Sequence, residues 1–254
     1  MARCGMQNVV CRAQAKVPVV AIYDPELKIA CDMNINNTLA LRNTRLVRTY
    51  MQLDERARQL TFAIKHWAAN RALNEAAYLV VCNTLTSYTW TLMVINYLQT
   101  RRVAPILPSL QEWPHEPVPR INGLDVSFAD DVDKYDTLQT FSLQNQESVG
   151  ALLFGFFHHY AYEFNYHRDV ASVRLGTIIT RHEKGFSNDN MICIEEPFTI
   201  SRNLGNTADV GSHRGIHQEL QRAHLMLAEG EPISSVFAKY EASKEVPSKP
   251  ESLR

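Results

Sequence analysis

Few side chains in this sequence have the type and spacing that chemistry requires. Asp32 stands in a short segment that alternates apolar and polar residues, so its carboxylate should point away from the apolar face of a strand. Such a carboxylate is a candidate ligand for a divalent cation, although a single strand aspartate is more often an ordinary surface residue. One carboxylate alone does not make a metal site.

Four histidines and one lysine are the other candidates. His213 and His217 are one helical turn apart, a spacing that can hold a metal, but no third ligand accompanies them and we expect a partly exposed helix face. His158 and His159 lie in an apolar segment and are interpreted as a core or groove-edge pair. Lys65 lies beside an apolar helical stripe, where its stem covers that stripe or its ammonium group points into a cleft. The sequence has no Gly-rich phosphate loop, no H-E-x-x-H and no nucleophile elbow.

The elements that must position these residues follow from periodicity. Short β-branched segments bounded by turn residues predict strands, and a spacing of three and four between apolar residues predicts helices. The predicted strands are residues 8–11, 17–23, 28–35, 170–174 and 191–194. The predicted helices are residues 38–51, a helix capped by Asp54, and residues 84–98, 148–166 and 215–227. A Pro-rich and then acidic connection fills residues 100–146.

Composition places the chain among globular proteins. It has 254 residues, 45% of them hydrophobic and 21% charged, which excludes global disorder and collagen-like structure. Its five cysteines are scattered and odd in number, which favours a reducing, intracellular setting and argues against a disulfide framework and a zinc knuckle. The uncharged run 76–100 has membrane length, but its many Asn, Thr, Ser and Gln residues predict a buried helix, so we expect no membrane association. No secretory signal is recognised at the N-terminus.

Charge is distributed unevenly along the chain. The formal net charge is −1, yet the basic residues exceed the acidic ones within residues 1–75 and the balance reverses beyond them. A basic excess permits a polyanionic partner but does not establish one, because nucleic-acid binding requires clustered charge.

Four ordered stretches carry a family resemblance. They resemble the noncanonical poly(A) polymerases and terminal uridylyltransferases of the DNA polymerase beta-like nucleotidyltransferase superfamily over roughly residues 5–228. The stretches are residues 16–20, 31–37 with 43–44, 65–68 with 84–88, and 192–198 with 203–207.

The resemblance implies an α+β fold. Residues 1–36 would be the C-terminal remnant of a mixed-sheet catalytic palm, and residues 37–228 a mainly helical central domain. That domain would include a poly(A)-polymerase-associated region at about residues 147–207. Residues 229–254 would form a tail, with disorder from about residue 242.

The implied activity is template-independent addition of AMP or UMP to RNA 3′ ends, with ATP or UTP as substrate and Mg²⁺ or Mn²⁺ as cofactor. Asp32 matches the third of three metal-binding carboxylates in this family. The other two would lie upstream of Met1, so we expect the chain to be inactive by itself.

The resemblance also implies a nucleotide site. Asn43 and Thr44 match contacts to the sugar, and Lys65 matches a lysine that binds the triphosphate. Ser87 matches a phosphate contact at a helix start, where free backbone amides favour anions. Tyr88 matches an aromatic residue that stacks on the base, although core packing would also explain it.

The last two nucleotide-binding candidates are Glu196 and Arg202. Glu196 matches an acidic residue near the base edge. Arg202 stands where uridylyltransferases usually have a histidine, so uridine preference is not supported and adenosine is modestly favoured.

Two further departures weaken the nucleotide site. Ala69 replaces a second lysine that the family often has, which should lower triphosphate affinity. Residues 77–83 add apolar residues where the family has a short turn, and an unspliced or misannotated stretch explains them.

Two other interpretations stay open. These departures favour a truncated paralogue that binds RNA or nucleotide without catalysis. Alternatively, the chain does not fold alone, because strands within residues 8–35 would lack partners in their sheet. Family members work in the cytoplasm or the nucleus, and no basic targeting cluster decides between them; we expect the cytoplasm.

Overall fold

Three antiparallel strands open the chain, as their alternation predicts. The computed structural model describes residues 4–14, 18–73, 84–102, 104–134, 136–187 and 192–241. In it, β1 (Gln7–Arg12), β2 (Val19–Asp24) and β3 (Ile29–Met33) form a sheet in the order β1-β2-β3. The Asp24 carboxylate accepts hydrogen bonds from the N–H groups of Glu26 and Leu27, which closes the turn between β2 and β3.

The apolar side of β3 is exposed. Ile29 is 54% and Met33 41% accessible, and Asp32 lies on the other side of the strand, as the alternation predicts. The chain divides into two compact units, Met1–Thr44 and Arg45–Arg254, and the division falls within α1 (Thr38–Leu53). The predicted boundary between residues 36 and 37 stays a prediction.

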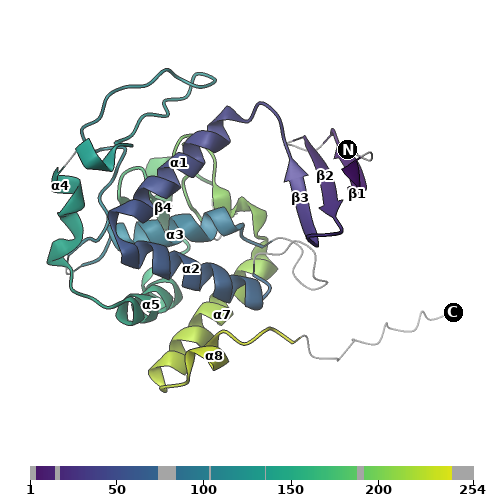
Figure 1. Cartoon of the computed structure of the whole chain (residues 1–254). Coiled ribbons are helices and arrows are strands. Elements are labelled where there is room, and N and C mark those ends of the chain that lie inside the picture. The colour runs from purple at the N-terminus through teal and green to yellow at the C-terminus, as the bar shows by residue number, and fades with distance from the viewer. Residues whose placement is uncertain are drawn as a thin grey trace. The chain divides into compact units, whose positions relative to one another are not determined.

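The second unit is mainly helical and has a large aromatic core. Its long helices include α2 (Glu55–Asn70), α3 (Ser87–Gln99), α5 (Val149–His158) and α7 (Val210–Ala228). Figure 1 shows α3 in the middle of this unit, next to α2. Trp67 packs edge-on against Trp90 at 5.5 Å and Phe157 at 4.9 Å between ring centroids. Strands and helices together confirm the α+β class.

Helix starts follow capping chemistry. Asp54 caps α2, as predicted, by accepting a hydrogen bond from the Arg56 N–H at 2.8 Å. The third predicted helix begins at Ser87 rather than Thr84, because the Thr86 hydroxyl accepts from the Thr89 N–H at 3.2 Å. Ser87 therefore lies in the first turn of a helix, as the sequence indicated.

A small hairpin was only partly predicted. β4 (Asp169–Ser172) pairs with β5 (Thr177–Thr180), a strand that the sequence pattern did not predict. The strand predicted at 191–194 is wrong over its described residues, which make a single bridge from Ile194 to Ala171. The reason is that the Ile194 N–H donates to the side chain of Asn203 at 3.0 Å instead of extending a ladder.

The predicted helix 148–166 changes character part-way. α5 ends at His158 and one π-helical turn, η4 (His159–Glu163), follows before the chain turns extended at Phe164. His159 is buried and His158 half-buried, which confirms a pair at the edge of the core.

The last long helix begins earlier than predicted. Asp209 caps α7, so the helix starts at Val210 rather than at residue 215. The expectation that His213 and His217 form a partly exposed face is wrong for His213, which is 6% accessible and packs edge-on against Tyr166 at 4.7 Å. His213 is buried because α7 packs against η4 and α5.

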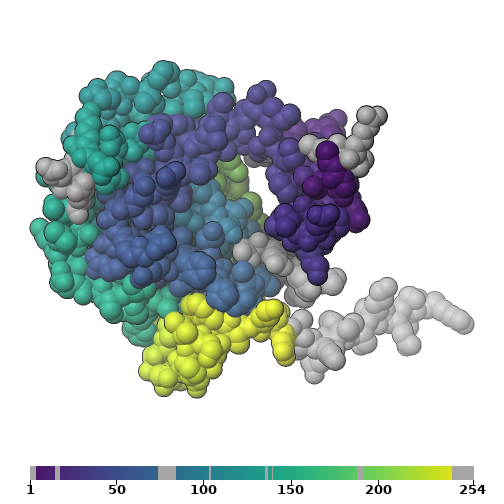
Figure 2. Space-filling view, viewed as in Figure 1, coloured from purple at the N-terminus to yellow at the C-terminus, as the bar shows by residue number. Residues whose placement is uncertain are grey.

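Short elements complete the unit. The short helices are α4 (Asp136–Gln139), α6 (Arg181–Lys184) and α8 (Ile233–Val236), with 3₁₀ turns η2 (Val132–Lys134), η3 (Phe141–Gln144) and η5 (Leu204–Thr207). The long connection at 104–134 covers the surface, in teal in Figure 2, and is anchored by the buried Leu110, Val126 and Phe128.

Some predictions concern residues that the structure does not describe. Lys16, the extra residues at 78–83 and the tail from residue 242 lie outside the described ranges. The described part of the uncharged run is the buried helix α3, as predicted. Among the described residues, no helix is both long and apolar enough to cross a membrane.

Candidate nucleotide site

Tyr88 and Glu196, 108 positions apart, meet side chain to side chain. The Tyr88 hydroxyl donates a hydrogen bond to Glu196 Oε1 at 3.2 Å. Tyr88 is the second residue of α3, and Glu196 ends an extended segment that follows β5 and α6. Burial and the neighbouring carboxylate raise the pKa of Tyr88 well above its usual value, so the hydroxyl stays a donor.

The Glu196 carboxylate is held from its other side by the backbone. Its Oε2 accepts from the N–H of Phe198, at 3.0 Å, and from the N–H of Thr199. The side chain is 1% accessible, and these donors satisfy a carboxylate that would otherwise be costly to bury. Glu196 therefore presents a fixed acceptor to the Tyr88 hydroxyl.

Arg202 ends the loop that begins at Glu196 and runs over residues 196–202. Its carbonyl accepts from the Glu196 N–H at 3.1 Å, and its exposed side chain is close enough to Tyr88 that its charge acts to lower the pKa of that hydroxyl. The structure thus brings Tyr88, Glu196 and Arg202 to one place.

Ser87 and Lys65 lie on neighbouring helices of the same unit. Ser87 is half-buried in the first turn of α3, next to Tyr88. Lys65 is exposed on α2, beside the buried Ile64 of the helix's apolar stripe. Its side chain is accessible rather than laid over the core, which leaves the ammonium group available to a ligand.

Asn43, Thr44 and Asp32 belong to the first unit. The Thr44 hydroxyl donates to the Ala40 carbonyl at 2.9 Å, and Asn43 Oδ1 is buried with no hydrogen-bond partner among the described residues. Asp32 is exposed on β3 and lies opposite Ala21 in the sheet register.

The described residues do not fit a pair of divalent metals. Asp32 supplies one carboxylate, and within the described ranges no group of three His, Cys, Asp or Glu side chains could hold a metal ion. The assignment of Asp32 as a metal ligand stays a prediction.

Sequence reasoning missed the residue that shapes this loop. Asn203 Oδ1 accepts from the N–H groups of Ile194 and Gly205, while its Nδ2 donates to the Ile192 carbonyl at 3.1 Å. A buried asparagine that replaces strand pairing has no periodic signal; only its place in the stretch 203–207 drew attention to it.

The solved structures provide the decisive comparison. The Cid1 poly(U) polymerase crystal structure superposes with a TM-score of 0.81 and 31% identity, over 93% of this chain and 74% of that one. The chain belongs to the Cid1 family of RNA nucleotidyltransferases.

Family models agree with this membership in two separate segments. Residues 1–52 match the mitochondrial-like poly(A) RNA polymerase central palm domain, and residues 148–202 match the Cid1 family poly A polymerase domain. Poly(A) RNA polymerase cid13 of Schizosaccharomyces pombe is 47% identical over 89% of this chain. Terminal uridylyltransferase 7 of Homo sapiens is 34% identical over 79% of this chain.

The chain spans only part of these relatives. It covers 39% of cid13 and 13% of the human uridylyltransferase. Structures of Cid1 are described in complex with the UTP analogue UMPNPP and with Mg 3′-dATP, which are statements about Cid1.

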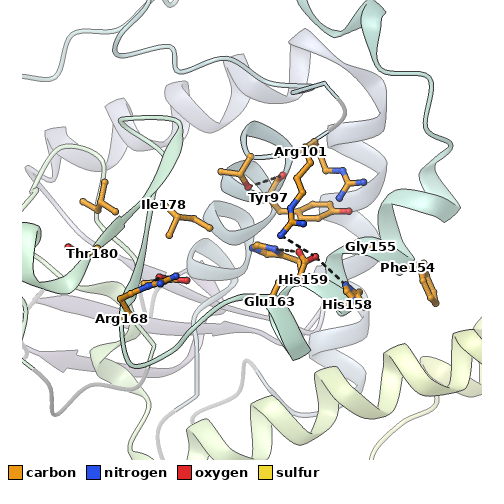
Figure 3. Close-up of a pocket in the computed structure, with 14 residues that line it drawn as sticks. Tyr97, Arg101, Phe154, Gly155, His158, His159, Glu163, Arg168, Ile178 and Thr180 are labelled. Atoms are coloured by element: carbon orange, nitrogen blue, oxygen red, sulfur yellow. Dashed lines mark hydrogen bonds and ion pairs between the residues drawn. The ribbon is translucent and has the colours of Figure 1, made fainter.

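A separate cavity of about 760 Å³ lies at the C-terminal end of α3, away from Ser87 and Tyr88 at its start. Figure 3 shows Glu163 there, joined to His158 and His159, with Arg101 and Arg168 on the walls. Burial lowers the pKa of His159 despite the nearby Glu163 carboxylate. None of the predicted nucleotide-binding residues lines this cavity.

Proposed function

We propose that this chain is part of an RNA nucleotidyltransferase that adds AMP or UMP to RNA 3′ ends, and that its second unit binds the base of the incoming nucleotide. The observation that carries the proposal is the Tyr88–Glu196 contact, which fixes an aromatic ring at the start of a helix. Membership of a family whose relatives are named poly(A) RNA polymerases and uridylyltransferases supports it.

The proposed roles are those that the family resemblance implies, and the chemistry of each side chain suits them. The Tyr88 ring, held by its hydroxyl, stacks on the base, and such stacking contributes about 1–3 kcal/mol. Lys65 contacts the triphosphate as a point charge, and Ser87 with the first amides of α3 contacts a phosphate. Asn43 and Thr44 contact the sugar. Arg202 faces the base edge. Its guanidinium group is always charged and only donates hydrogen bonds, whereas a neutral histidine offers one donor and one acceptor.

Asp32 is proposed as one carboxylate that would contribute to holding Mg²⁺ or Mn²⁺, and such an ion would supply charge neutralisation for phosphoryl transfer. Because one carboxylate does not make that site, binding of nucleotide and RNA is the part of the function that these residues support. A cytoplasmic location is proposed from the likeness to a solved structure that is described as a cytoplasmic RNA terminal U-transferase.

Photo-crosslinking with 8-azido-ATP tests the proposal directly. We expect labelled peptides that contain Tyr88 or lie within residues 192–203, with labelling that excess ATP suppresses. Labelling elsewhere, or labelling that ATP does not suppress, would contradict the proposed site.

A primer-extension assay with Mg²⁺, RNA and ATP or UTP complements the crosslinking. Extension would identify an enzyme active by itself, whereas specific crosslinking without extension would favour the binding-only interpretation. If neither crosslinking nor extension is observed, both the enzyme proposal and the binding-only interpretation are refuted.

A further inference from the structure

A second buried glutamate lies directly beside the first. Glu195 is fully buried and Glu196 is 1% accessible, and successive side chains of an extended segment point to opposite sides. Glu196 contacts Tyr88, whereas Glu195 contacts the β4–β5 hairpin and α6.

Three side chains surround the Glu195 carboxylate. Its Oε1 accepts from Ser172 Oγ at 2.8 Å and from Arg174 Nε at 3.0 Å, and its Oε2 accepts from Lys184 Nζ. Ser172 is itself oriented, because its hydroxyl accepts from the Leu175 N–H at 3.2 Å. Two cations and a hydroxyl compensate the desolvation of one buried carboxylate.

The donors come from three successive parts of the chain. Ser172 ends β4, Arg174 lies in the hairpin turn, and Lys184 is the last residue of α6. Thr180 and Glu183 form a capping box that fixes α6 and hence the position of Lys184. The Glu195 N–H donates to the Ala171 carbonyl and the Ala171 N–H donates to the Cys193 carbonyl, which holds the same segment in line with β4.

We propose that Glu195 is a positioning residue for nucleotide binding, acting through Glu196 on Tyr88. Its bonds to Lys184, Arg174 and Ser172 fix the depth and rotation of residues 194–196, so that Glu196 meets the Tyr88 hydroxyl. This inference rests on the proposed function only for its consequence on nucleotide affinity; the contact itself can be tested without nucleotide.

Fluorine NMR of 3-fluorotyrosine-labelled protein reads the contact. The chain has ten tyrosines, and the signal lost in Tyr88→Phe identifies Tyr88. Glu196→Gln, which alters the direct partner, should shift this signal. We expect Glu195→Gln and Lys184→Met to shift or broaden it as well, and Lys184→Arg to restore it.

Nucleotide affinity supplies the second readout. Glu195→Gln should weaken ATP binding roughly tenfold, because displacement of a positioning group by a fraction of an ångström is costly. The matched control is Glu219→Gln, since Glu219 on α7 also accepts from two cationic side chains, those of Arg71 and Arg222. This control should leave the Tyr88 signal and the ATP affinity unchanged.

The outcomes separate the two proposals. A folded Glu195→Gln protein with an unchanged Tyr88 signal and unchanged ATP affinity would overturn the positioning role. If Glu195→Gln does not fold, Ser172→Ala, which removes one donor, decides by the same criteria. If the wild-type chain binds no ATP, the proposed function fails, and the fluorine signal alone still decides whether Glu195 positions Tyr88.

Discussion

The Tyr88 hydroxyl has an acceptor on a loop more than a hundred residues away, and that pairing gives the aromatic ring one fixed orientation. Sequence analysis assigned both residues through resemblance, but periodicity alone could not separate Tyr88 from core packing. The structure shows a half-buried Tyr88 side chain that is bonded to Glu196, and stacking of its ring on a base stays a prediction.

Lys65 allows a test of the triphosphate contact. Its exposed ammonium group should bind the β- and γ-phosphates, so Lys65→Ala should weaken ATP binding about tenfold, the equivalent of one charge-assisted hydrogen bond. AMP binding should not change. Calorimetric titration with both nucleotides measures this difference.

Arg58 supplies the control for Lys65. It lies on the same helix, is exposed and pairs with Glu55, so Arg58→Ala should leave both affinities unchanged. An equal loss of ATP and AMP affinity in Lys65→Ala would show that the lysine acts on something other than the triphosphate.

Arg202 is predicted to limit uridine preference. The resemblance implies a histidine here in uridylyltransferases, so Arg202→His should raise the affinity for UTP relative to ATP by about tenfold, roughly the contribution of one hydrogen bond. Competition binding with both nucleotides gives the ratio. A ratio equal to that of the wild-type protein would remove Arg202 from the specificity determinants, and Arg214→His on the exposed surface of α7 is the matched control.

At the scale of elements, local signals located most helices and the first three strands. The Asp54 cap and the turn at Asp24 were readable because both rest on neighbours within three residues. The segment at 191–194 was misjudged because its pairing partner is a side chain, Asn203, and β5 was missed because a four-residue strand gives little alternation. Long-range contacts decide such segments.

The packing of α7 on η4, which buries His213, predicts that the stability of the fold depends on pH. Burial lowers the pKa of His213 from 6.5 to about 4, with further lowering by His217, His167 and Arg181. Below pH 6.5 the unfolded chain takes up a proton here that the folded protein excludes, so stability falls as the pH falls toward 4. This one group should lower the free energy of unfolding by at most about 1 kcal/mol between pH 7 and pH 5.5.

Urea unfolding at both pH values measures that cost. His213→Phe should reduce the loss of stability between them, whereas His182→Gln, at an exposed position on α6, should not. An identical pH dependence in wild type and His213→Phe would show that His213 is not responsible.

At the scale of the whole molecule, the hydrophobic core of the described residues comes from one unit. Its buried apolar side chains begin at Leu46, and the three strands of the first unit are exposed or half-buried. Every nucleotide-binding candidate lies beyond residue 36, and five of the seven, Lys65, Ser87, Tyr88, Glu196 and Arg202, belong to the second unit. Residues 37–254 should therefore bind the nucleotide without the sheet.

Deletion of residues 1–36 tests that separation. Residues 37–254 should unfold cooperatively at the melting temperature of the same transition in the full chain and bind ATP with unchanged affinity. Calorimetry and nucleotide titration measure both quantities. A melting temperature lowered by several degrees, or a large loss of ATP affinity, would show that the strands contribute to the fold or the site.

The most direct measurement is the dissociation constant of ATP for wild type, Tyr88→Phe and Tyr88→Ala. Loss of the ring should weaken binding about tenfold or more, and loss of the hydroxyl alone should weaken it less, because stacking survives while its orientation by Glu196 does not. Equal affinity for ATP in all three folded proteins would contradict a nucleotide site at Tyr88 and with it the central claim.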